Sequence, residues 1–332
     1  IFGTPEAYAQ LKVQDFRFEN GRMGTLHAHA DYDVEEGQIN IDAIADDLSS
    51  GQTLINGYVS PRKNYIDLGI TAHHSPLEFI HSFCSSFMGD VSVRGDGTCR
   101  VFGDLRQINL EGLMTATGTI EVTPLNTIYS LRKDTIRMIP DEIIFPSDTI
   151  YDRENHFAVV TGSLHHKNLT NLTFDMSIDA QNFLSYDTHD YGDQTFFGTV
   201  YGTGTCDIKG RSGEISFDIN ATPDEGSFIE YNAAGPESIS SAEFIHWESA
   251  HKQAAPYSSY DSMQDATALQ QAAMKNQTSD LRLNFLINAT PDFTLRVLMD
   301  ETTGDRIDLN GEGMLRANYF NKGAFDLFGN YQ

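Results

Sequence analysis

Histidine is the residue type in this chain that is best suited to hold a metal ion. The sequence contains 11 histidines, among which His27 and His29 would share one face of a strand. His73-His74 and His165-His166 are adjacent pairs whose members would point to opposite faces. A zinc site needs three or four ligands that converge, and no second cluster is spaced to complete one. We therefore expect solvated strand histidines that can titrate near neutral pH, and no metal site.

Two acidic segments carry carboxylates at spacings that invite a calcium hypothesis. In Asp31-x-Asp33-x-Glu35-Glu36-Gly37 the glycine stands one place too late, and the acid that would bind the ion with two oxygens is missing. Residues 187–193 form a second acidic segment of the same kind. We expect both to be acidic turns rather than calcium sites.

The usual catalytic motifs are missing from the sequence. It has no Gly-x-Ser-x-Gly nucleophile elbow, no phosphate-binding Walker loop and no His-Glu-x-x-His pair. Gly95-x-Gly97 and Gly202-x-Gly204 lack the third glycine and the following helix of a dinucleotide site. With 47 acidic residues, a carboxylate pair that could act as acid and base is too common to single out. We predict a protein without enzymatic activity and without a cofactor.

The cysteines point to packing rather than to redox or zinc chemistry. Cys84, Cys99 and Cys206 are an odd number and show no Cys-x-x-Cys spacing. We expect small buried side chains, and a Cys99–Cys206 disulfide stays open because the sequence does not supply its geometry.

Composition and charge exclude several classes of partner. The chain has 332 residues, of which 47 are acidic and 22 basic, for a formal net charge of −25. A surface that follows nucleic-acid phosphates needs clustered Lys and Arg, so we expect no nucleic acid. The same charge disfavours electrostatic docking on an anionic bilayer. No run reaches the roughly 18–20 apolar residues of a membrane-spanning helix, and the start of the chain suggests an excerpt of a longer protein.

Hydrophobic residues alternate with polar ones along most of the chain. The alternation is clearest in residues 66–70, 215–220, 281–288 and 294–300. Such a pattern predicts strands with one apolar and one polar face. Turn sequences with glycine recur between these runs, for example Asn20-Gly21 and Thr303-Gly304. We predict an all-β chain whose sheet is an elongated, curved antiparallel meander.

Short internal repeats accompany the alternation. Gly95–Gly103 resembles Gly202–Gly210, and Ile219–Asp224 matches Ile287–Asp292 letter for letter. Because the glycines fall at alternating strand positions, they indicate either close approach of neighbouring backbones or sharp bending of the sheet.

Two segments depart from the strand pattern. Ser75, Pro76 and Glu78 form an N-terminal capping box, which predicts a short amphipathic helix over residues 76–88. Residues 248–279 are rich in Ala, Gln and Ser, and we expect them to be a polar excursion that is helical or mobile. The predicted organisation is therefore residues 1–247, the excursion, and C-terminal hairpins over 280–332.

Several segments in sequence order carry a family resemblance. Thr161-Gly162-Ser163-Leu164-His165-His166 and residues 195–204 are similar to signatures of the C-terminal region of Bacteroidota TamB proteins. Residues 288–292, 300–305 and 311–313 resemble the segment that precedes the terminal strand of that family. Phe197 and Gly202 replace the Tyr and Ala of the family pattern. The resemblance covers about residues 50–330.

The resemblance implies an AsmA-like, bridge-type protein of the bacterial envelope. In that family a long sheet curls into a taco-like groove with an apolar interior and a polar exterior. Such proteins are anchored in the inner membrane and cross the periplasm. They connect to a BamA-type outer-membrane barrel, and they are tied to phospholipid movement and outer-membrane protein assembly.

On this basis we predict that the apolar strand faces line a groove for phospholipid acyl chains. The predicted lining residues are Val91, Val93, Ile120, Val122, Val200, Ile208, Ile215, Phe217, Ile219, Leu281, Leu283, Phe285, Ile287, Leu295, Val297 and Met299.

Three alternatives remain open at this stage. The same residues would form the core of a closed β-sandwich. A second alternative is a periplasmic scaffold or chaperone that binds nascent outer-membrane β-strands along a free strand edge. The third is a carbohydrate-binding sandwich, for which the single tryptophan, Trp247, offers little support.

Overall fold

The computed structural model describes residues 7–47, 51–85, 88–168, 170–191, 196–211, 213–232, 280–300, 303–320 and 325–331. Within these residues, nineteen strands form one sheet. The strands are β1 (Ala7–Phe18), β2 (Gly21–Asp33), β3 (Gln38–Asp46), β4 (Gln52–Ser60), β5 (Tyr65–Pro76), β6 (Met88–Asp104), β7 (Gln107–Val122), β8 (Thr127–Ile139), β9 (Glu142–Tyr151), β10 (Phe157–Lys167), β11 (Thr170–Thr188), β12 (Phe196–Arg211), β13 (Glu214–Pro223), β14 (Phe228–Asn232), β15 (Asp280–Ala289), β16 (Thr294–Asp300), β17 (Asp305–Asn310), β18 (Gly313–Phe320) and β19 (Phe325–Tyr331).

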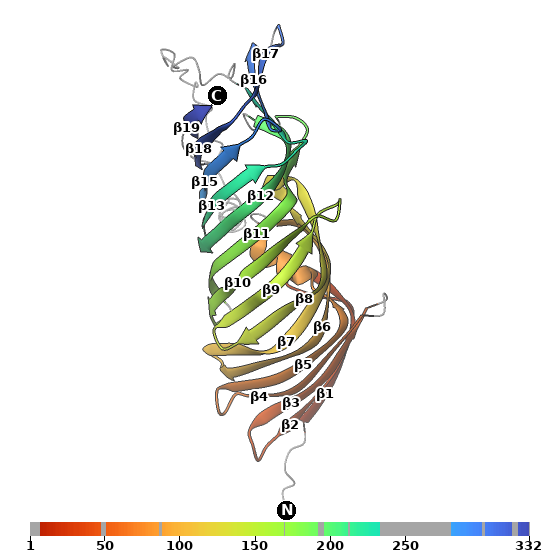
Figure 1. Cartoon of the computed structure of the whole chain (residues 1–332). Helices are drawn as coiled ribbons and strands as arrows, with labels where there is room; N and C mark the ends of the chain where they lie inside the picture. The colour runs from red at the N-terminus through yellow and green to blue at the C-terminus, as the bar shows by residue number, and fades with distance from the viewer. Residues whose placement is uncertain are drawn as a thin grey trace, which may run out of the picture.

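The sheet is a meander that extends along one axis. From β1 to β13 each strand pairs with the next one in the antiparallel direction. Figure 1 shows the strands stacked from the N-terminal end to the C-terminal end in a long, curved, open sheet. The prediction of an elongated all-β sheet is confirmed, and the alternative of a closed β-sandwich is wrong because the described strands form a single sheet.

A transverse crease runs across the last strands of the sheet. One half of β12 pairs with β13 and the other half with β14, and β15 and β16 continue this arrangement as the parallel neighbours of β13 and β14. In turn β18 pairs with β15 and β17 with β16. Each pair of consecutive strands is therefore one long strand that bends at the crease. The two copies of Ile-Asn-Ala-Thr-Pro-Asp lie where β13 and β15 end, because proline cannot continue the ladder.

The crease is held together by side chains that replace ladder hydrogen bonds. The Ser227 hydroxyl donates to the carbonyl oxygen of Tyr201 and accepts from the N–H of the same residue, both at 3.0 Å. The side-chain amide of Asn310 donates to the carbonyl oxygen of Phe293 at 3.2 Å and to the hydroxyl of Thr294 at 2.8 Å. The bend is thus a built feature of the sheet rather than a break in it.

The connection between the two parallel ladders is long by necessity. Parallel neighbours need a crossover of a dozen residues or more, and residues 233–279 separate β14 from β15. The predicted polar excursion over 248–279 lies outside the described residues. The predicted boundaries at 247 and 280 therefore stay predictions.

Glycines on one face allow the sheet to curve. Gly204 has a φ of +152°, and a Cβ added there would lie 2.2 Å from the carbonyl oxygen of Asn220 on the next strand. Such close approach of two backbones is possible only without a side chain.

The predicted helix over residues 76–88 is wrong in its extent. Pro76 still belongs to β5, and only a 3₁₀ turn (Glu78–Ile80) and a four-residue helix, α1 (His81–Cys84), follow it. Ser75 does not cap this turn, since its hydroxyl donates to the carbonyl oxygen of Gln52 and accepts from Thr53. A further 3₁₀ turn (Thr123–Leu125) links β7 and β8. None of the helical turns in the described residues has the length and hydrophobicity that a membrane span requires.

Candidate functional site

One face of the sheet is apolar along its length. Directly paired residues share a face, and the registers pair Val91 with Ile120 and Phe217 with both Ile208 and Leu283. Following the registers from strand to strand places fifteen of the sixteen predicted lining residues on this same face. These are Val91, Val93, Ile120, Val122, Val200, Ile208, Ile215, Phe217, Ile219, Leu281, Leu283, Phe285, Ile287, Leu295 and Val297.

Met299 is the predicted lining residue that the register does not place. It lies at an irregularity between Leu298 and Asp300, and its side chain is exposed.

The apolar face is the concave one. Side chains on strands that are not neighbours can meet only on the inside of a curved sheet. The rings of Tyr129 on β8 and Phe183 on β11 stack at a centroid distance of 4.7 Å, although β9 and β10 lie between these strands. Both residues belong to a buried apolar cluster with Ile150 and Val160.

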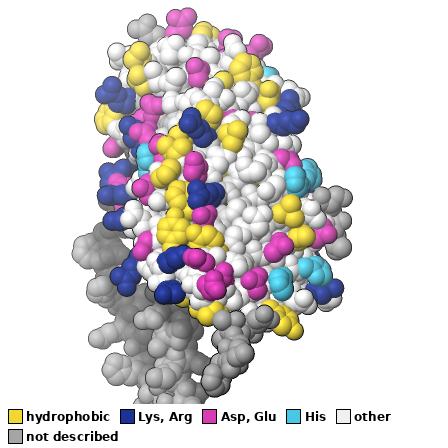
Figure 2. Space-filling view, turned by 90° about the horizontal axis from the view of Figure 1, so that it is seen from below, with side chains coloured by type: hydrophobic (Ala, Val, Ile, Leu, Met, Phe, Trp, Pro, Cys, Tyr) yellow, Lys and Arg dark blue, Asp and Glu magenta, His cyan; other side chains and the backbone are white. Residues whose placement is uncertain are grey.

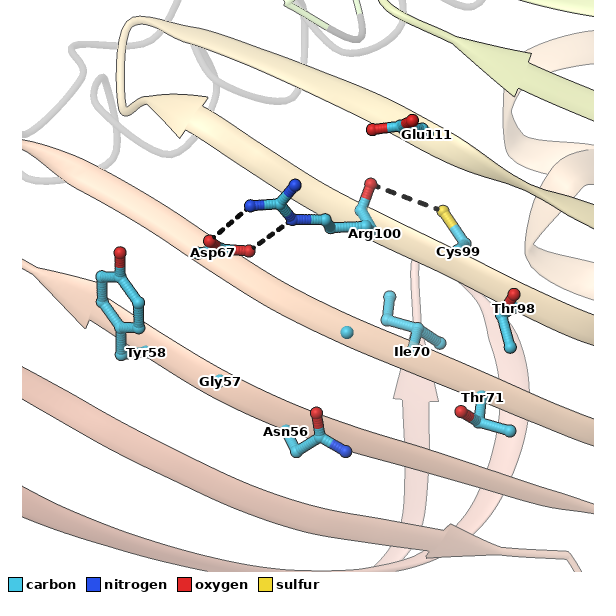
Figure 3. A pocket seen from close by; sticks show the side chains of 11 residues that line it. Asn56, Gly57, Tyr58, Asp67, Ile70, Thr71, Thr98, Cys99, Arg100 and Glu111 are labelled. Carbon is cyan, nitrogen blue, oxygen red and sulfur yellow. Dashed lines mark hydrogen bonds and ion pairs between the residues drawn. The ribbon is translucent and has the colours of Figure 1, made fainter.

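The opposite, outer face carries polar ladders. On β5 and β6 the guanidinium of Arg100 donates two hydrogen bonds of 2.7 Å to the carboxylate of Asp67, which lowers the pKa of that carboxyl. Figure 3 shows this pair beside Tyr58 and Asn56 in a shallow hollow of about 430 Å³. Figure 2 shows basic and acidic side chains on the visible surface, several of them next to each other.

The concave face is open at its ends and closed in its middle. Leu11 on β1 is 55% exposed and Ile307 on β17 is 50% exposed, although both lie in apolar registers. In contrast, Tyr129 on β8 is 5% exposed and Phe183 on β11 is 4% exposed. We call the closed part the constriction, and define it by the buried residues Tyr129, Ile150, Ala158, Val160 and Phe183.

A bulge in β11 places Phe183 in the constriction. The register between β11 and β12 shifts between Ala180 and Phe183, and Asn182 at this shift has a φ of +47°. The fully buried carboxylate of Asp152, in the β9–β10 turn, accepts a 3.0 Å hydrogen bond from the N–H of Leu184. The bulge and this carboxylate together direct the Phe183 ring across the groove toward β8.

Hydrogen bonds between distant strand ends also close the groove along both rims of the sheet, beside the constriction. The N–H of Ile108, at the start of β7, donates to the side-chain oxygen of Asn168 in the β10–β11 turn at 2.9 Å. At the other rim, the side-chain amide of Asn126 donates to the carbonyl oxygen of Asp187 on β11. Strands that lie far apart in pairing order are therefore tied at the centre and at both edges.

The segment between β5 and β6 covers part of the concave face beside the constriction. Leu77 is buried against Val91, Val93 and Ala116, and Phe79 packs on the same cluster. Phe79 also contacts the ring of Phe18, from the end of β1, at a centroid distance of 5.4 Å. The turn therefore bridges the groove from β6 to the β1–β2 hairpin.

Cys99 and Cys206 both lie on the concave face, but on different strands. Cys99 pairs with Ile70 and Gly112, and Cys206 pairs with Ile178 and Ile219. Both thiols are free, so the open question of a disulfide between them is answered in the negative. Burial raises the pKa of the Cys99 thiol to about 11 and that of Cys206 to about 12.

The residues considered for metal binding do not assemble into a site in the described part of the chain. No group of three or more His, Cys, Asp or Glu side chains converges there. Asp33 instead accepts hydrogen bonds from the N–H groups of Glu35 and Glu36, which is the bonding of an acidic turn. His27 and His29 share the outer face of β2.

Two acids on the concave face were missed by the sequence reasoning. Asp134 on β8 pairs with Ala116, and Asp148 on β9 pairs with Val160, so both side chains belong to the apolar face. Both are only 8% exposed. The available signal was the interruption of apolar alternation between Leu131 and Ile136 by a lone acid.

Comparison with known proteins identifies one family. Residues 148–332, more than half of the chain, match the family model described as the TamB C-terminal domain. The match is to the family and does not address the bacterial phylum. No curated protein matches the chain, and no solved structure matches it.

Proposed function

The chain belongs to the TamB C-terminal domain family, and from this premise we propose that its concave face carries phospholipid acyl chains between the inner and outer membranes. The family acts in the translocation and assembly module of outer-membrane biogenesis, and it is a family of the periplasm and cell envelope. Lipid transport by this chain, a BamA-type barrel as its partner and an inner-membrane anchor on the whole protein are parts of the proposal.

The observation that carries the proposal is the continuity of the apolar face across the sheet. Registers from β1 to β18 keep apolar side chains such as Leu11, Val93 and Leu283 on one side. Moving an acyl chain through water costs about 0.8 kcal/mol for each CH₂ group. A face that is apolar over most of the sheet, with Asp134 and Asp148 as exceptions, lowers this cost, and no bond needs to be made or broken. The proposed role is therefore non-catalytic.

The experiment is native mass spectrometry of the purified chain, with extraction and identification of bound lipid. The test variant is Leu283→Asp/Phe285→Asp, which places two charges on the concave face of β15. The control is Leu286→Asp, because Leu286 lies on the outer face of the same strand. We expect bound phospholipid in the wild type and the control, and its loss in a test variant that keeps its β-sheet circular dichroism. A lipid-free wild type would overturn the proposal for this segment.

A second candidate function follows from the edges of the sheet. Among the described strands, β1 pairs only with β2, and β17 pairs only with β16. A sheet edge offers backbone donors and acceptors to an incoming strand, so a nascent outer-membrane protein would bind there by strand addition. Crosslinking of a β-strand peptide to β17, with no lipid on the concave face, would favour this function over lipid transfer.

A further inference from the structure

The ladder between β8 and β9 is interrupted at the level of two buried acids. Within the described stretch 88–168, these strands pair at Ser130–Tyr151 and again from Arg137–Ile144 onward, with no pairing between. Pro146 lies in this gap and cannot donate a ladder hydrogen bond. The strands therefore need other groups to hold them together here. We call this interrupted region the β8–β9 seam.

The carboxylates of Asp134 and Asp148 bridge the seam in a reciprocal way. The N–H of Thr135, next to Asp134, donates to Oδ1 of Asp148 at 2.6 Å. The N–H of Thr149, next to Asp148, donates to the carboxylate of Asp134, as does the N–H of Arg132. Each carboxylate thus occupies the place of a missing backbone acceptor on the neighbouring strand, and the two carboxyl groups come close together.

One oxygen of each carboxylate is left without a partner. Oδ2 of Asp134 and Oδ2 of Asp148 are both buried, and neither has a hydrogen-bond partner among the described residues. Leu131 and Ile136 flank Asp134 on the concave face, and both pack against a buried apolar cluster. Two negative charges with orphaned acceptors in such surroundings are unfavourable, whereas a single proton supplies both a donor and a neutralised charge.

Other charged groups near the seam point away from it. Arg132 lies over the ring of Tyr151 on the outer face, and Glu142 is joined to His165 on that face. On the neighbouring strands, Ala116 of β7 and Val160 of β10 stand opposite the two acids.

Further ionisable groups of β7 and β8 also point away from the pair. Glu111 and Glu121 of β7 and Arg137 of β8 lie in outer-face registers, and Lys133 is exposed at a bulge. The pKa of Asp134 is raised by burial and then by Asp148, against hydrogen bonds from the N–H groups of Arg132 and Thr149.

We propose that Asp134 and Asp148 form a proton-binding pair that closes the β8–β9 seam when it holds a proton and loosens the seam when it does not. The proton comes from solvent, binds one orphaned Oδ2 and lets that oxygen donate to the carboxylate of the partner. Burial, together with Asp148, raises the pKa of Asp134 to about 6, and burial also raises the pKa of Asp148. The pair therefore releases its proton within the range between mildly acidic and neutral pH.

The consequence for the groove rests on the proposed function. Tyr129 on β8 and Ile150 on β9 are both part of the constriction, so loosening of the seam loosens the closed part of the groove. Passage of an acyl chain becomes easier at neutral pH than at pH 5. The seam itself responds to pH whether or not lipid is carried.

The test compares thermal melting at pH 5.0 and pH 7.5 in the full chain and in Asp134→Asn. Asparagine keeps the shape of a protonated aspartate and can donate to the orphaned oxygen of Asp148. We expect the variant to melt about 2–4 °C higher than the wild type at pH 7.5 and to gain clearly less at pH 5.0, where the folded wild type holds its proton. Hydrogen exchange in peptides that span residues 130–151 is expected to slow by at least tenfold in the variant at pH 7.5.

Asp104→Asn is the matched control because Asp104 is an exposed carboxyl whose pKa is lowered by hydrogen bonds from Arg106 and Asn64. This control substitution should not raise the melting temperature at pH 7.5. An equal gain of Asp134→Asn at both pH values, unchanged exchange at the seam, or failure of the variant to fold at pH 5.0 would overturn the proton pair. If the chain binds lipid but the melting temperature and the exchange at the seam do not respond to pH, only this inference is overturned. If the seam responds to pH but no lipid is bound, only the proposed function is overturned.

Discussion

The phenolic hydroxyl of Tyr129 donates a 3.0 Å hydrogen bond to the backbone carbonyl oxygen of Leu184. Tyr129 lies on β8 and Leu184 on β11, so the bond crosses the concave face rather than following the sheet. The phenol is almost completely buried, which raises the pKa of Tyr129. This bond and the adjacent stacking on Phe183 hold the two walls of the groove together.

The first prediction concerns the constriction. Phe183 is 4% exposed and stacks on Tyr129, so Phe183→Ala removes a large buried ring and leaves a cavity. We expect it to lower the free energy of unfolding by about 3–5 kcal/mol, measured by urea denaturation. Tyr129→Phe keeps the stacking but leaves the Leu184 carbonyl without its donor, at a cost of about 1–3 kcal/mol. A smaller loss for Phe183→Ala than for Tyr129→Phe would show that the ring does not hold the walls together.

The faces of the strands could be predicted from the sequence because strand alternation is local. Once Leu281 and Leu283 are on a strand, the geometry of that strand alone puts them on one face. The register then joins the faces of neighbouring strands, and Val93 and Phe217 end on the same side of the sheet as expected. The repeated hexapeptides also mark a real feature, the crease, although the bend itself was not foreseen.

Features that depend on distant partners could not be predicted. The capping box at Ser75 failed because the hydroxyl of this residue bonds instead to Thr53, which is 22 residues earlier in the chain. The constriction depends on the hydrogen bond that the N–H of Leu184 donates to the carboxylate of Asp152, which lies 32 residues earlier in the chain. Local pattern cannot reveal which of several possible partners a polar group will find after the sheet has curled.

The second prediction concerns the crease. Ser227 is 2% exposed, and its hydroxyl satisfies both the N–H and the carbonyl oxygen of Tyr201. Ser227→Ala leaves both groups without this partner, so we expect a loss of about 1–3 kcal/mol in the free energy of unfolding. Hydrogen exchange should rise in β14 and β16. Ser216→Ala is the control, because that hydroxyl makes a single exposed hydrogen bond of 3.3 Å to Lys209, and its effect should stay within about 0.5 kcal/mol.

The third prediction uses two glycines of the same strand and the same face. A Cβ at Gly204 would lie 2.2 Å from the Asn220 carbonyl oxygen, at a φ of +152° that L-residues rarely adopt. A Cβ at Gly202 would meet nothing nearer than 3.5 Å. Gly204→Ala should therefore lower the melting temperature by several degrees, while Gly202→Ala should leave it unchanged or raise it slightly. Equal effects of the two substitutions would contradict a role for Gly204 in the close approach of β12 and β13.

The fourth prediction concerns the two thiols on the concave face. Burial raises the pKa of Cys99 from 9.0 to about 11 and that of Cys206 from 9.0 to about 12. Because the thiolate is the reactive species, and its smaller population is partly offset by its higher nucleophilicity, alkylation at pH 8 should be roughly 10-fold slower at Cys99 and roughly 30-fold slower at Cys206 than at an ordinary thiol. The measurement is mass spectrometry during a time course with iodoacetamide, in a Cys84→Ser background.

The same protein in concentrated urea provides the control for this prediction, since both thiols should then react at the rate of a free peptide. Their order also matters: Cys99 should react before Cys206 because its pKa is raised less. If both thiols of the folded chain reacted at the unfolded rate, the concave face at β6 and β12 would be open to water. An apolar path for acyl chains could not then pass these two positions.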